Sequence, residues 1–218
     1  MAAGGIIMTN NTSSRSRQVN VSQMVKIAVL IAIMLILNYT PLGYLRIGPV
    51  EITFLQIPVV VGAIMLGPAA GALLGLVFGI TSLAQAPVSP VFAPAFTTVP
   101  VLIAIVCIVP RVLVGWLSGL FFRAVRKTRL NGLIGYAMTG FLGSVLNTVL
   151  FISGVVVVLG KYIESTMAAL DLLTGKTVAA FWAGIAAVNG IPEAIATAII
   201  VAAVCKALSA LDKHRIKM

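Results

Sequence analysis

Charge is scarce in this chain. Charged side chains make up 9% of its 218 residues, with only five acidic residues against fifteen basic ones. A soluble domain needs more polar groups than this to cover its surface. The sequence is instead 60% hydrophobic, with a mean hydropathy of +1.13. Several apolar runs approach or exceed the ~20 residues that a spanning helix requires, so we predict an all-α integral membrane protein.

The chain also has few residues that could form a catalytic or metal site. Its two cysteines, Cys107 and Cys205, lie in apolar runs without zinc or redox spacing, and its one histidine, His214, lies in a basic tail. The sequence contains no nucleophile motif with a membrane histidine. It also contains no phosphate-binding loop, because no glycine-rich stretch is followed by Lys-Ser or Lys-Thr. We therefore expect a protein that is not an enzyme, with no catalytic residue, no metal, no cofactor and no ATP hydrolysis of its own.

Glycine and proline divide the apolar sequence into six segments. We expect membrane-spanning helices over residues 24–38, 53–66, 69–83, 99–122, 133–159 and 177–208. Irregular loops over 38–52, 84–98 and 160–176 then lie at one membrane face, and the turn at 67–68 and a basic loop over 123–132 lie at the other. The expected organisation is a flexible cytoplasmic segment (1–23), a substrate-binding membrane domain (24–211) and a basic cytoplasmic tail (212–218).

The basic residues are distributed unevenly between the two predicted membrane faces. Eleven lie on the side of the termini, whereas Arg46, Lys161 and Lys176 lie opposite and Arg111 lies within the membrane. Because cytoplasmic loops carry the excess of Lys and Arg, this count predicts that both termini are cytoplasmic and that the three irregular loops are outside. Short basic clusters between apolar runs are typical of membrane proteins, so we expect no nucleic-acid partner.

Two ionisable residues, Arg111 and Glu193, lie deep inside predicted spans, away from the ends of their helices. Such groups are rare in membranes and usually face the bundle interior or a water-filled cavity. At ~1.5 Å per residue, they lie ~18 Å and ~24 Å from the outer ends of their helices, which is close enough for an ion pair. The pair could simply join two helices, or one member could contact a ligand, and both interpretations remain open here.

Polar and aromatic side chains are expected to meet in the outer half of the bundle. Helical spacing places Asn147 and Phe151 on one face and Trp182, Asn189 and Glu193 on another. Each amide alone could equally make an interhelical hydrogen bond, typically ~0.6 kcal/mol in membranes. Together they predict a pocket for a small, polar, largely neutral molecule. The predicted substrate-binding residues are Tyr39, Gln56, Phe92, Arg111, Asn147, Phe151, Trp182, Asn189 and Glu193.

Small residues mark two further helix faces. Gly71, Gly75 and Gly79 stand four apart, which predicts close packing on another helix, because a bare glycine face gains nothing from lipid. Ala28 and Ala32 are also four apart. Their face could pack within the bundle, or it could be a docking face for another membrane protein.

Several motifs after about residue 23 match one family pattern. They are Ala28-Val-Leu-Ile-Ala32, the block from Ile57-Pro to Gly79, Pro110-Arg111, Asn147-Thr148 and Ile191-Pro-Glu193. With six helices and this length, the chain resembles the substrate-binding S components of energy-coupling-factor (ECF) vitamin transporters. Residues 53–62 and the Pro-Leu-Gly loop are most similar to the pantothenate type. Gln56 departs from that type, since a histidine is expected before Ile-Pro, so folate, a pyridoxine-like vitamin or another small metabolite stays an alternative ligand.

The resemblance implies a mechanism. An S component in the prokaryotic plasma membrane binds its vitamin from outside and docks, through Ala28 and Ala32, on a transmembrane coupling protein that carries two ATPase subunits. ATP turnover topples the S component and releases the vitamin inward. The alternative is a self-sufficient secondary carrier or channel, although no inverted repeat or matching pair of broken helices is visible. An intramembrane enzyme would need a nucleophile that the sequence does not offer.

Overall fold

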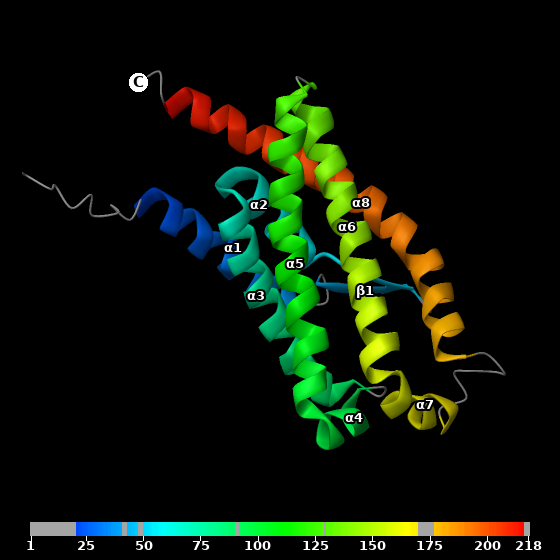
Figure 1. Cartoon of the computed structure of the whole chain (residues 1–218). Helices are drawn as coiled ribbons and strands as arrows, with labels where there is room; N and C mark the ends of the chain where they lie inside the picture. The colour runs from blue at the N-terminus through cyan, green and yellow to red at the C-terminus, as the bar shows by residue number, and fades with distance from the viewer. Residues whose placement is uncertain are drawn as a thin grey trace, which may run out of the picture.

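The computed structural model describes residues 21–40, 43–47, 50–89, 92–128, 130–169 and 177–215, which form long helices and one short hairpin (Figure 1). Residues 1–20 of the predicted segment 1–23 and residues 216–218 of the predicted tail 212–218 fall outside these ranges, whereas residues 212–215 continue the last helix. The elements are α1 (Val21–Tyr39), β1 (Tyr44–Ile47), β2 (Val50–Thr53), α2 (Gln56–Leu66), α3 (Pro68–Gln85), the 3-10 turn η1 (Ala86–Val88), α4 (Ala93–Thr98), α5 (Pro100–Lys127), α6 (Gly132–Gly154), the π-helical segment η2 (Val155–Leu159), α7 (Gly160–Ala169) and α8 (Val178–Arg215).

The prediction of an all-helical integral membrane protein is confirmed apart from the hairpin. Within the described ranges, five stretches are long and apolar enough to cross a membrane: Val21–Tyr39, Pro68–Val88, Pro100–Lys127, Gly132–Glu164 and Val178–Leu211. The apolar helix α2 has 11 residues and extends only ~16 Å, about half the hydrocarbon thickness. Six spanning segments therefore stay a prediction.

The ends of the helices lie where they are expected if successive helices cross the bundle in opposite directions. The start of α1, the connection between α5 and α6 and the end of α8 lie at one end, and α4 and α7 lie at the other (Figure 1). The last turn of α5 carries Arg126 and Lys127 at the first of these ends. The cytoplasmic placement of this end remains a prediction from the distribution of charge.

Three expected loop regions contain regular structure instead. Part of 38–52 forms an antiparallel hairpin in which Tyr44 pairs with Thr53 and Ile47 with Val50, as suits its β-branched and aromatic residues. The hairpin lies across the bundle, and β2 contacts α8. The short α4 interrupts 84–98, and α7 replaces much of 160–176, because Ile163 and Met167 share a face that is fully buried.

Close contact between α3 and α5 confirms the packing role predicted for Gly71, Gly75 and Gly79. A Cβ atom on Gly75 would overlap the backbone carbonyl of Arg111, and one on Gly71 would overlap that of Gly115. The two backbones can approach only because these residues have no side chain. These glycines thereby allow α3 to pack directly against the turn of α5 that carries Arg111.

We expect Gly75→Ala to lower stability by about 1–3 kcal/mol, because the added methyl group forces the two backbones apart. The matched control is Gly184→Ala on α8, where an added Cβ meets no atom within 4 Å. This control is expected to leave stability unchanged or slightly higher, since Ala favours helix over Gly. Thermal unfolding in detergent measures both variants, and equal melting temperatures would contradict the close contact.

Candidate functional site

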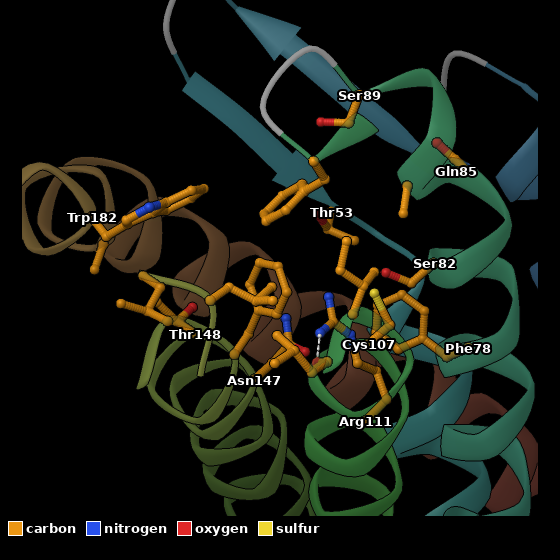
Figure 2. Close-up of a pocket in the computed structure, with 18 of the residues that line it drawn as sticks. Thr53, Phe78, Ser82, Gln85, Ser89, Cys107, Arg111, Asn147, Thr148 and Trp182 are labelled. Carbon is orange, nitrogen blue, oxygen red and sulfur yellow. Dashed lines mark hydrogen bonds between the residues drawn. The ribbon is translucent and has the colours of Figure 1, made fainter. Parts of the chain in front are cut away.

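A cavity of about 460 Å³ lies between α3, α5, α6 and α8 (Figure 2). The cavity is also lined by Thr53 at the end of β2 and by Ser89 and Phe92, which precede α4. The volume is in the range of sites for small molecules. Residues from sequence positions 53 to 193 line it, so the cavity is assembled from elements that lie far apart in the sequence.

Arg111 brings a positive charge into this cavity. Its position in α5 follows Pro110, which has no backbone N–H to donate to the carbonyl of Val106 four residues earlier. The Nη1 atom of Arg111 donates to that carbonyl at 3.1 Å (Figure 2). The proline therefore leaves this carbonyl without its helical donor, and the guanidinium of the next residue, Arg111, binds it. Arg111 as a whole is only 6% exposed.

Aromatic rings enclose the guanidinium and continue along the cavity wall. The Arg111 guanidinium carbon lies 3.9 Å from the ring centroid of Phe151, a cation–π distance. The Phe92 ring lies 6.3 Å from Phe151 and 6.1 Å from Trp182, with which it is stacked. The wall joins α5, α6, α8 and the chain before α4, and it gives one side of the cavity an apolar surface.

Glu193 is the acidic group of the cavity, and Gln56 supports it from behind. Glu193 is 6% exposed, and its Oε1 atom accepts a hydrogen bond from Gln56 Nε2 at 2.7 Å. Gln56 is fully buried and lies outside the lining, at the first residue of α2. Its Nε2 atom also lies 3.0 Å from Ser144 Oγ and 3.1 Å from Thr197 Oγ1.

Asn147 and Trp182 each bring to the cavity lining a polar atom whose hydrogen-bonding capacity the rest of the described chain does not use. Asn147 Oδ1 and Trp182 Nε1 are buried, and neither has a hydrogen-bond partner among the described residues. Buried polar groups are normally satisfied, so such atoms in a cavity indicate where a polar ligand can bind. One is an acceptor and the other a donor, which suits an amide or a hydroxyl group.

The structure brings most of the predicted site residues together. Those that line the cavity are Phe92, Arg111, Asn147, Phe151, Trp182 and Glu193. Gln56 lies behind Glu193, and the side chain of Asn189 is outside the described part. Tyr39 is 84% exposed and does not reach the cavity, because α1 turns its Met34 face to the bundle. Contact of any of these residues with a ligand, and the predicted Arg111–Glu193 ion pair, stay predictions.

One wall of the cavity was not predicted from the sequence. Phe78, Ser82 and Gln85 of α3 line it, spaced four and three residues apart on one helix face. This periodicity is the signal in the sequence, but the helix predicted over 69–83 ended before Gln85. Thr148, next to Asn147, also lines the cavity.

The chemistry of the site is that of binding. Arg111 suits an anionic group, Glu193 suits a hydrogen-bond donor, and the aromatic wall suits an apolar body. Within the described ranges, no group of three His, Cys, Asp or Glu side chains is placed to hold a metal ion.

Comparison with known proteins gives a consistent result. The family model described as "ECF transporter, substrate-specific component" matches residues 22–205. The chain is 28% identical over 200 residues to the pantothenic acid transporter PanT of Lactococcus lactis, covering 86% of this chain and 94% of that one. It is 30% identical over 178 residues to the pantothenate transporter PanT of Leuconostoc mesenteroides, covering 77% and 79% of the two chains.

Proposed function

Because the chain belongs to the family of ECF transporter substrate-specific components, we propose that its cavity binds pantothenate for uptake into the cell. The family makes it a transport protein, a multi-pass protein of the cell membrane and one part of an ECF transporter. The observation that carries the choice of ligand is Arg111, a guanidinium fixed inside an aromatic-walled cavity. Both relatives described above are named as transporters of this vitamin.

The groups of pantothenate match the cavity one by one. Its carboxylate pairs with Arg111, which is already oriented by Val106 and Phe151, so little side-chain freedom is lost on binding. Its amide faces Asn147, whose Oδ1 atom has spare capacity. Its geminal methyl groups pack on the aromatic wall, and a hydroxyl group donates to Glu193.

Transport requires partners that hydrolyse ATP. We propose a transmembrane coupling protein bound to two ATPase subunits, with α1 as the docking helix. Ala28 and Ala32 are exposed, and Met34 is the one residue of α1 that is buried. Two small residues on an exposed face allow another helix to approach closely.

The first test is the identity of the bound molecule. We expect the chain, purified in detergent from a vitamin-replete host, to release pantothenate near one per chain when denatured, measured by mass spectrometry. A nanomolar site, near −12 kcal/mol, retains its ligand through purification. A different vitamin would contradict the proposed ligand, and an empty chain without thermal shift across a vitamin panel would contradict a vitamin-binding subunit.

Arg111→Gln is expected to weaken pantothenate binding roughly tenfold to a hundredfold, because a charged hydrogen bond to the carboxylate is lost. Pantothenol, which has an alcohol in place of the carboxylate, is expected to bind the variant and the wild type equally. Titration calorimetry measures both ligands. The control is Arg126→Gln, an exposed position at the far end of α5. Equal losses for the two ligands would mean that Arg111 does not meet the carboxylate.

Ala28→Trp and Ala32→Trp are expected to leave pantothenate affinity intact and to stop uptake, because a large ring prevents close docking on α1. Uptake is measured in cells that make the ECF module and cannot synthesise the vitamin. Val149→Trp is the control, since Val149 is 54% exposed on α6. Normal uptake by both α1 variants would move the docking surface elsewhere.

A further inference from the structure

Gln56 connects three helices at one buried point. Its amide Nε2 atom, on the first residue of α2, lies within 3.1 Å of oxygen atoms from Ser144 on α6 and from Glu193 and Thr197 on α8. An amide nitrogen has two N–H groups, so three oxygens share them. Glu193 Oε1 is nearest, at 2.7 Å, and a carboxylate is the strongest acceptor of the three. The Glu193 bond is therefore the principal contact of this amide.

The contact orders a side chain that belongs to the cavity. Glu193 lines the cavity, whereas Gln56 does not. A glutamate side chain that lacked this hydrogen bond would keep more freedom to lose when a ligand binds, and that loss reduces affinity. With one oxygen held by Gln56 from behind, the Glu193 carboxylate has its position set before a ligand arrives.

The position of Glu193 also bears on the orientation of the ligand. Arg111 and Glu193 line the same cavity with opposite formal charges. An anionic ligand group is attracted by Arg111 and repelled by a carboxylate, so the two groups sort the two ends of the ligand. A hydroxyl end can donate to Glu193, and a carboxylate end cannot.

We propose that Gln56 is a positioning residue, which orients Glu193 to accept a hydrogen bond from a ligand hydroxyl and so selects molecules with a hydroxyl at that end. The inference rests on the proposed function, because it names the group of pantothenate that Glu193 recognises. Gln56 acts through Glu193 and does not touch the ligand itself.

The test uses Gln56→Met, which keeps the length of the side chain and removes the donor. Pantothenate and two analogues, each without one of its hydroxyls, are titrated against wild type and variant. We expect the variant to bind pantothenate roughly tenfold to a hundredfold more weakly, because the buried Glu193 carboxylate loses this hydrogen bond. The analogue that lacks the hydroxyl bound by Glu193 is expected to bind both proteins equally, because the hydrogen bond from that hydroxyl to Glu193 is then absent in both. Gln56→His, which restores an N–H donor, is expected to recover part of the affinity.

Thr197→Val is the matched control. It removes another oxygen from the Gln56 amide and leaves the contact with Glu193 in place. We expect this variant to bind pantothenate as the wild type does. If Thr197→Val weakened binding as much as Gln56→Met, and if both analogues showed the same loss as pantothenate, Gln56 would only join the helices and the inference would be overturned.

A second measurement is independent of the ligand. The infrared carboxylate band of Glu193, assigned by subtracting the spectrum of Glu193→Gln, is expected to shift in Gln56→Met when the N–H donor is lost. An unchanged band would overturn the inference even if affinity fell. A wild type that binds no pantothenate would overturn the proposed ligand, and the band would still decide whether Gln56 holds Glu193.

Discussion

The constraint on which this structure depends is the placement of one guanidinium inside a membrane bundle. An arginine at the centre of a spanning helix costs about 2.5–3.5 kcal/mol on insertion scales, and the cost falls when the group finds partners. Arg111 has the carbonyl that Pro110 leaves without a helical donor and the face of Phe151. Both partners belong to the walls of the cavity, so the features that offset the cost also prepare the charge for a ligand.

The scaffold around Arg111 follows from the same requirement. Gly75 allows α3 to lie directly against the backbone carbonyl of Arg111, so α3 packs closely on the turn of α5 that carries the charge. On the opposite side, α8 brings Glu193, which Gln56 supports from α2. The contact between α3 and α5 and the buried amide of Gln56 thus have the same effect, since each restricts the position of one charged group of the cavity.

The sequence predicted those parts of the structure that depend on local pattern. Long apolar runs identified the spans, and the rarity of charge in a membrane singled out Arg111 and Glu193. The hairpin was missed because each strand has only four residues, too few for a clear alternation. Gln56 was expected among the residues that bind the substrate, but the sequence does not reveal that α2 begins inside the bundle. Tyr39 was misplaced for a similar reason, since the rotation of α1 is set by tertiary contacts around Met34.

The exposure of α1 has a thermodynamic consequence. In water, covering an apolar face is favourable because water is released, but lipid tails are as apolar as the side chains of this helix. Exchanging lipid for protein on α1 therefore yields little hydrophobic free energy. Any association through this face therefore has to be stabilised mainly by close packing between the helices. An interface of that kind can form and separate repeatedly.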